Sequence, residues 1–231
     1  VTFSSGSLTA DTSDAFAVTY GDATKLVLSA RPTSGYNRQT LSNFHVKVTD
    51  PEGNVNTATT GDISVAVNSA SNGGNTTNLY GTKTQALTSA ETDFSDLQIR
   101  GTAGTWVLRF SKDGGGVSTV DASLTITYGA IDHIAFSQQP TLTASGVEFG
   151  SAVTVTAYDG NDNVVTNYNH TVTLSVNKGA TFGGTYAHEL NNGTWTFTGL
   201  TVVGVADTYT LTATTDGDPT PYTANSTACR L

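Results

Sequence analysis

The sequence predicts an all-β protein made of two consecutive β-sandwiches of Greek-key type. Apolar and polar residues alternate with a period of two through nearly every ordered-looking segment, as in strands with one buried face. Turn residues separate these segments at short spacing, giving about seven strands per copy, the number typical of a two-sheet sandwich. No stretch of ten or more residues has the 3.6-residue apolar period of a helix, so we expect almost no helix.

A long internal repeat doubles this pattern. The segment Ala15–Pro32 recurs in altered form as Ser123–Pro140, and Tyr20 matches Tyr128, 108 positions later. A period of this length is that of a whole domain rather than of a solenoid unit. The offset changes only slightly farther on, at loops rich in Gly, Asn and Ser. The later matched pairs are Asp50 and Asp159, Asn54 and Asn163, Phe94 and Phe197, and Trp106 and Tyr209.

The repeat predicts three segments. Residues 22–130 and 131–231 are expected to form one domain each, since about 100 residues suffice for a domain. Residues 1–21 resemble the last hairpin of a repeat, and we expect them to be the end of a preceding repeat or a strand-donating extension. The connection between the copies, Tyr128–Asp132, is short and not rich in Gly or Ser, which predicts a semi-rigid joint.

Composition narrows the range of partners. The net charge is −9, and the ten Lys and Arg residues are scattered singly, which argues against nucleic acid and anionic membranes. No apolar run approaches the roughly 18 residues that span a membrane, so direct membrane insertion is not expected. The chain starts without a charged-then-apolar leader, and we expect a piece of a longer protein or a mature secreted form. Cys229 is alone, and we expect a small apolar filler on a terminal strand, with an intermolecular bridge as the alternative.

Local motifs offer one candidate metal site. Asp159, Asn161 and Asp162 place oxygen-bearing side chains close together, as at the start of a calcium loop. The following residues lack the Gly and the bidentate Glu of an EF-hand, because positions 164 and 170 are Val164 and His170. The alternative is a polar turn, in which Asp and Asn side chains bond their own backbone. We expect the turn, and no bound cofactor.

No set of residues predicts catalysis. The four His residues lack zinc-binding spacing, and no nucleophile elbow is present. Glu91, Asp93 and Asp96 offer paired carboxylates of the kind that glycosidases use, but their place at a strand start without an aromatic cleft indicates a solvated edge. We therefore predict a protein that is not an enzyme. Four N-x-S/T sequons would accept glycans only in an organism that modifies its surface proteins. They begin at Asn75, Asn169, Asn192 and Asn225. Asn192 also starts an Asn-Gly pair that predicts a two-residue hairpin.

The strand motifs together resemble the bacterial immunoglobulin-like repeats of large cell-surface and adhesin-type proteins. In the first copy they are Val46–Val55, Phe94–Leu97 and Gly104–Leu108, and in the second Val155–Val164, Phe197–Leu200 and Asp207–Leu211. The resemblance implies an extracellular, immunoglobulin-like fold used in adhesins and cell-surface stalks.

Three residues depart from the pattern of these repeats. Trp106 stands where Tyr is usual, and Asp162 and Asp207 stand where Gly is usual. Tyr209 fits the corner tyrosine of such folds, whose hydroxyl bonds nearby backbone. Because Trp106 lacks a hydroxyl, we expect the first copy to lack that bond.

We predict a non-catalytic structural or adhesive module of a secreted or surface protein. Its partners would be other repeats of the same protein or copies of itself, and a host or surface glycan or protein. One alternative is a filament subunit, in which residues 1–20 add strands to a neighbouring molecule. Another is a carbohydrate-binding module with Trp195 or Tyr186 as a stacking platform, although Trp195 shares the inward parity of Phe197.

Overall fold

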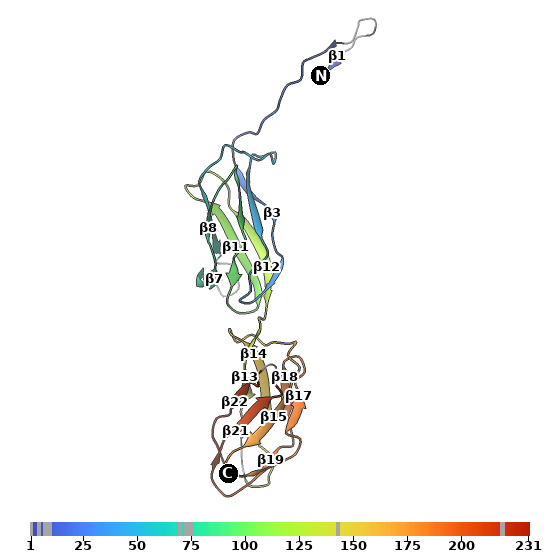
Figure 1. Cartoon of the computed structure of the whole chain (residues 1–231), viewed down its shortest axis with the longest axis vertical. Helices are drawn as coiled ribbons and strands as arrows, with labels where there is room; N and C mark the ends of the chain where they lie inside the picture. Colours follow the sequence, from blue (N-terminus) through green and yellow to red (C-terminus); the bar gives the residue numbers. More distant parts are fainter. Residues whose placement is uncertain are drawn as a thin grey trace.

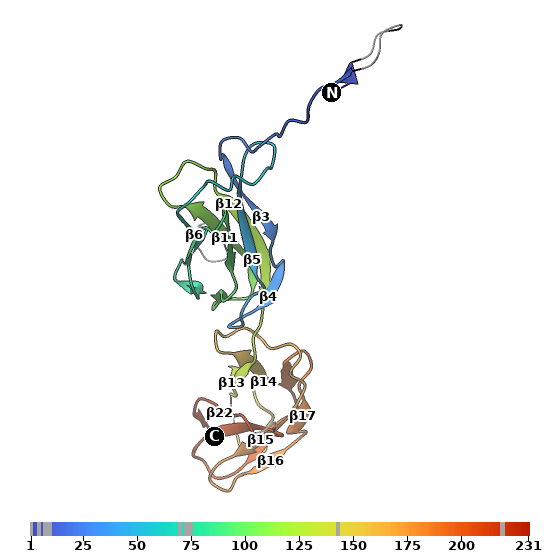
Figure 2. The same cartoon turned by 45° about the horizontal axis from the view of Figure 1, so that its top comes forward.

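The computed structural model describes residues 2, 3, 6, 11–68, 71, 76–141, 144–217 and 220–231. Within these residues the only helical element is one 3₁₀ turn, Thr76–Asn78, and all other regular elements are strands, which confirms the all-β prediction. Two strand-rich bodies follow each other along the long axis (Figure 1), and the view of Figure 2 shows the same order. The N-terminal segment extends away from the first body and carries β1 (Thr2–Phe3) and β2 (Asp11–Thr12).

The first body consists of two facing sheets. A three-stranded sheet has the order β3 (Lys25–Ala30), β5 (Phe44–Thr49) and β9 (Glu91–Phe94). The five-stranded sheet has the order β4 (Ser34–Tyr36), β12 (Val120–Thr127), β11 (Gly104–Lys112), β6 (Asp62–Val67) and β8 (Thr84–Ala86). Only β4 joins its neighbour in parallel. A short pair, β7 (Leu79–Tyr80) and β10 (Gln98–Ile99), lies beside them.

The two main sheets of the second body repeat this order without a counterpart of β4. One sheet contains β13 (Ile131–Gln138), β14 (Val153–Asp159) and β18 (Thr194–Phe197). The other contains β17 (Ala187–Glu189), β15 (Thr171–Val176), β21 (Leu211–Thr215) and β22 (Thr223–Asn225). Two short pairs complete it, β16 (Thr181–Gly183) with β19 (Thr201–Val203), and β20 (Thr208–Tyr209) with β23 (Cys229–Arg230).

Each body has its own hydrophobic core. In the first, Phe110 packs against Phe44 and Phe94 with ring centroids 5.4 and 5.3 Å apart. The second core includes the inward residues Val155 and Leu211. No buried residue is shared between the two clusters. The alternation of apolar residues therefore placed the core faces correctly.

The corner bond predicted for Tyr209 is present, and its Oη donates to the carbonyl of Val205 at 2.8 Å. The expectation that the first copy lacks such a bond is wrong. Trp106 Nε1 donates to the carbonyl of Thr102 at 3.0 Å, also four residues upstream. The larger indole ring reaches the equivalent carbonyl with its ring N–H, so the matching carbonyls of the two bodies accept from a tryptophan N–H in one and a tyrosine hydroxyl in the other.

The Asn192–Gly193 turn forms as predicted, with φ of 51° and 74°. The predicted two-residue hairpin closes at its tip, where Asn191 and Thr194 form an antiparallel bridge. It extends no farther, because the flanking strands β17 and β18 pair with β15 and β14 in different sheets. The turn marks the place where the chain crosses between the sheets. Ser89 and Ala90 make the matching turn in the first body, with φ of 53° and 64°, without an Asn-Gly signal.

Residues of the N-terminal extension carry apolar side chains with no core around them. Phe16 is 71% exposed and Val18 is 84% exposed. Their counterparts in the repeat, Leu124 and Ile126, lie on β12 and are buried in the first core. This segment thus has the sequence of a sandwich strand without a sheet to cover it.

Candidate functional site

An extended polar cluster lies where the two bodies meet, around the carboxylate of Asp159 at the end of β14. Its Oδ1 accepts the backbone N–H groups of Asn161 and Asn163 at 2.8 and 3.1 Å. Its Oδ2 accepts Gly129 N–H from the connecting segment at 2.8 Å. Asn37 of the first body donates its amide to the same oxygen at 2.8 Å. One buried carboxylate thus binds its own loop, the connection and the preceding body.

Asn37 is fully buried and bonds on both sides of its amide. Its Oδ1 accepts Gly101 N–H at 3.0 Å within the first body. Its Nδ2 donates across the joint to Asp159 and also to Asn161 Oδ1 at 3.0 Å. The neighbouring Arg38 donates its Nε to the same Asn161 oxygen at 3.0 Å. An Asn side chain suits this place because it accepts and donates at once.

Asn163 supplies a second connection across the joint. Its Oδ1 accepts Ala103 N–H at 2.6 Å, and its Nδ2 donates to the carbonyl of Gly101 at 2.9 Å. The same Nδ2 lies within hydrogen-bond distance of both Asp159 oxygens. We call this set of bonded residues the joint network. Its members are Asn37, Arg38, Gly101, Ala103, Gly129, Asp159, Asn161 and Asn163.

Burial and hydrogen bonding act in opposite directions on Asp159. Burial raises the pKa of its carboxyl group, whereas the N–H donors of Gly129, Asn37 and Asn163 lower it. The donors prevail, and the pKa lies below its ordinary value. The carboxylate therefore remains charged at neutral pH, when each of its hydrogen bonds is charge-assisted and stronger than a neutral one.

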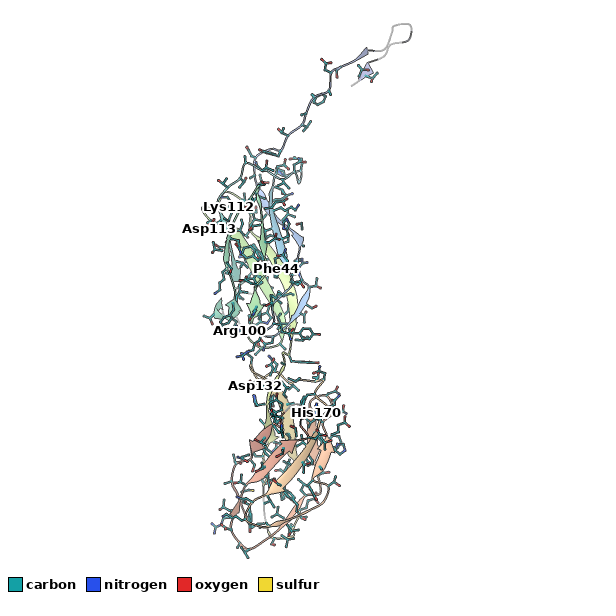
Figure 3. The ribbon with its side chains drawn as sticks, viewed as in Figure 1. Phe44, Arg100, Lys112, Asp113, Asp132 and His170 are labelled. Carbon is teal, nitrogen blue, oxygen red and sulfur yellow. The ribbon has the colours of Figure 1, made fainter. Side chains whose placement is uncertain are left out.

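Glycine permits the close approach of the two bodies. A Cβ on Gly129 would lie 2.5 Å from the carbonyl oxygen of Asn37, and a Cβ on Gly160 would lie 2.5 Å from Arg38 Nη1. Side chains around the joint are shown in Figure 3, where Arg100 lies at the end of the first body and Asp132 and His170 at the facing end of the second.

The residues of the predicted calcium site belong to this joint. Asp159 and Asn161 lie together, but their oxygens already accept the N–H groups described above. Asp162 is exposed, has a left-handed φ of 59°, and has an oxygen 3.6 Å from His133 Nε2. In the described part of the chain, no group of three or more His, Cys, Asp or Glu residues could hold a metal ion. The hydrogen bonds of Asp159 and Asn161 are those of a polar turn, and calcium stays the alternative hypothesis.

The predicted carboxylate cluster is held by basic neighbours. Glu91 and Asp93 lie on β9 and contact the two ring nitrogens of His45 at 3.3 and 2.7 Å. Asp96 lies apart from them and accepts the Thr82 hydroxyl at 2.7 Å. Glu91 and Asp93 therefore bind one imidazole ring, and Asp96 is held elsewhere.

The proposed sugar platforms differ in access. Trp195 is half-buried, and the ring of His188 covers one of its faces with centroids 3.5 Å apart and planes at 4°. Tyr186 is 44% exposed and stacks on Phe182 at 5.9 Å. His188 therefore covers one of the two faces with which Trp195 could stack on a sugar.

Three sequon residues, Asn169, Asn192 and Asn225, are exposed. Asn75 lies outside the described residues. Cys229 is a free, buried thiol on β23, and burial raises its pKa, as fits an apolar filler. Across the described ranges, no helix has the length and apolar character needed to cross a membrane.

Sequence comparisons with known protein families and with curated proteins give no match. Solved structures with a similar arrangement include the D0–D1 domain of intimin, at 12% identity and a TM-score of 0.31, over 91% of this chain and 99% of that one. The Escherichia coli adhesin FdeC is 19% identical with a TM-score of 0.39, over 90% and 65%. A β-glycosidase from Bacteroides vulgatus is 12% identical with a TM-score of 0.38, over 91% of this chain and only 25% of that enzyme. At these values none of the similarities carries an argument about function.

Proposed function

We propose that this chain is a non-catalytic structural module of an extracellular surface protein, in which two immunoglobulin-like domains, residues 22–130 and 131–231, act as a stiff spacer. The spacer would present an adhesive surface at a distance from its point of attachment. Other repeats of the same protein or copies of itself would be its neighbours, and a surface glycan or protein its target.

The joint network carries this proposal. A spacer needs a connection that resists bending, and relative domain motion is the default where an interface is small. Here Asp159 and Asn163 bind the first body directly while Gly129 fixes the connecting segment to the same carboxylate. The resemblance of the strand motifs to bacterial immunoglobulin-like repeats supports the same function.

The stiffness can be measured with a matched pair of variants. Nitroxide labels on Thr105→Cys and Thr173→Cys, with Cys229→Ala, would report the distance distribution between the two bodies, because both threonines are exposed. We expect a narrow distribution that broadens in Asn163→Ala. Asn54→Ala, at the matching but exposed position of the first body, should leave it narrow. A distribution that is already broad in the unchanged joint contradicts the spacer.

A filament subunit is the second candidate, and the exposed apolar residues of the N-terminal extension favour it. Phe16 and Val18 present an apolar stripe that a neighbouring sheet edge would cover. A two-stranded hairpin is marginal in water, so we expect residues 1–20 to become ordered only on such an edge. Deleting residues 1–20 would abolish polymers in the filament and leave both sandwiches folded in the spacer. Unfolding of the first sandwich on deletion would contradict both.

A further inference from the structure

The first body repeats the carboxylate arrangement of the joint at its opposite end. Asp50 Oδ2 accepts Gly21 N–H at 2.8 Å, as Asp159 Oδ2 accepts Gly129 N–H. Asn54 donates its backbone N–H to Asp50 Oδ1 at 2.8 Å and its side-chain amide to Oδ2 at 3.0 Å. The glycine bond and the bonds from Asn54 therefore match those that Gly129 and Asn163 make to Asp159, which also accepts Asn161 N–H. We call residues 50–54 with Gly21 the upper pole.

In the part of the chain that the structure describes, no body lies over the upper pole, in contrast to the joint. Asn54 is exposed, whereas its counterpart Asn163 is 8% exposed beneath Ala103 and Gly101. A Cβ on Gly21 would meet only Asp50, at 3.6 Å or more. The space that Asn37 fills at the joint is therefore open here.

We propose that the upper pole is a docking surface for the lower end of another immunoglobulin-like domain that carries an Asn at the position of Asn37. This inference rests on the proposed spacer function. The incoming amide would donate to Asp50 Oδ2, and a backbone N–H matching that of Ala103 would donate to Asn54 Oδ1. The bond to the Asp50 carboxylate would be charge-assisted and the bond to Asn54 Oδ1 would be buried, and both would form without any rearrangement of the loop.

The segment leading into Gly21 fits this occupant. Phe16 and Val18 stand where the last strand of the first body has Leu124 and Ile126. Tyr20 and Gly21 match Tyr128 and Gly129, which connect that strand to the second body. The segment before the upper pole thus matches in sequence the strand that ends at the joint, and the docked domain would cover its two exposed side chains.

Charge at the upper pole selects the incoming domain further. Glu52 takes the place of Asn161, so a carboxylate replaces the amide oxygen that accepts Arg38 at the joint. Pro51 takes the place of Gly160, where a Cβ would lie 2.5 Å from the Arg38 guanidinium. A basic side chain of the partner would clash with Pro51 in the position that Arg38 takes at the joint. It would therefore adopt another conformation, in which it pairs with Glu52. The partner has an Asn and a flexible Lys or Arg side by side.

The lower end of this chain's own second body does not have these features. Ser145 occupies the position of Asn37 and accepts Gly204 N–H at 3.1 Å, as Asn37 accepts that of Gly101. Its hydroxyl is shorter than an amide and has no second polar group that projects beyond this bond. The fitting occupant is a domain like the first body, not the second body of another copy.

The test is a chain in which an extra copy of residues 22–128 replaces residues 1–20 and joins directly to Gly21. The extra copy is unlabelled and is ligated to a ¹⁵N-labelled Gly21–Leu231 chain. Hydrogen exchange is then observed only for the amides of the original chain and not for those of the extra copy. The extra copy brings the complete first core, and it supplies Asn37 and Arg38 to the upper pole. We expect the amides of Gly21 and Asn54 to exchange roughly tenfold more slowly than in the unchanged chain. The matched control is Asn37→Ser in the extra copy alone, which should remove the slowing.

Unchanged exchange at Gly21 and Asn54, with Gly129 and Asn163 protected, would overturn the docking surface and leave the spacer intact. Equal slowing with Asn37→Ser would also overturn it, because the contact would then not use the amide. Fast exchange at Gly129 and Asn163 themselves would instead refute the spacer.

A variant of the whole chain tests the same pairing without the extra copy. The double variant Ser145→Asn, Gly146→Arg supplies both the amide and the basic side chain to the second body's lower end, since Arg38 and Gly146 have similar φ values of 62° and 77°. The Gly21 and Asn54 resonances should then shift with protein concentration, and in the unchanged chain they should not. The absence of a shift, together with unchanged exchange in the fused chain, would reject the proposal.

Discussion

The substitution Asn37→Ser separates the two functions of Asn37 within one side chain. Ser145 shows that a hydroxyl at this position still accepts the glycine N–H of its own body, at 3.1 Å. The bond to Gly101 should therefore survive in the variant. The donated bonds to Asp159 and Asn161, at 2.8 and 3.0 Å, should be lost. The change thus acts on the joint and spares the first body.

The loss of stability at the joint depends on Asp159, the charged group that loses the Asn37 amide as a donor. A hydrogen bond to a charged group contributes about 1.5–3 kcal/mol. Asp159 keeps its other donors, and water can enter the opened joint, so we expect the lower part of this range, about 1.5–2 kcal/mol. Since each 1.4 kcal/mol is a factor of ten, joint opening should become about 10- to 30-fold more frequent.

Native-state hydrogen exchange measures this opening at the amides of Ala103 and Gly129, which donate to Asn163 and Asp159 across the joint. Both should exchange about 10- to 30-fold faster in Asn37→Ser, while amides of the two cores are unchanged. Ser145→Ala is the matched control, because it removes the equivalent bond to Gly204 away from the joint. Equal exchange of Ala103 and Gly129 in both variants would refute the view that the Asn37 amide holds the bodies together.

Three further predictions concern stability and metal binding. The N–H donors of Gly21 and Asn54 lower the pKa of Asp50 from 3.8 to about 2, so the stability that its carboxylate contributes is complete above pH 3.8 and is lost as the pH falls toward 2. In Asp50→Asn, the free energy of unfolding of the first body should therefore depend less on pH between 3.8 and 2, and an unchanged dependence would contradict this. Tyr209→Phe removes one hydroxyl bond without changing the ring, and urea unfolding should show a loss of about 0.5–1.5 kcal/mol, with no loss if water replaces the bond. Millimolar calcium should leave the melting temperature of the second body unchanged, and a rise of several degrees that Asp159→Ala abolishes would establish the metal site.

Much of the fold could be predicted from the sequence, because strand periodicity is a local property. Phe44 and Val155 lie on alternating segments, and both point into a core as their parity requires. The Asn192–Gly193 turn was also predictable, since two left-handed residues in succession favour Asn and Gly. The partner of each flanking strand was not predictable, because the same tight turn can connect two strands of one sheet or strands of two different sheets.

The candidate site shows the same division more clearly. The sequence marked Asp159 and Asn161 as an unusual polar loop and offered a turn or a calcium site as explanations. It did not mark Asn37, which is 122 positions from Asp159 and stands in no motif. A repeat match aligns Asp50 with Asp159 and Gly21 with Gly129, and this was the only available signal that the loop serves the connection between bodies.

The sequence by itself determined the strands, the repeat and the faces that become buried, because each depends on side-chain chemistry at short or fixed spacing. Only the tertiary structure decided that Asn37 bonds to Asp159, and Asn163 to Ala103 and Gly101, across the joint, since a polar side chain finds its partner only after two folded surfaces meet. Tertiary structure also decided that Trp106 performs the task of Tyr209, because ring size and backbone position together set the reach of the indole N–H.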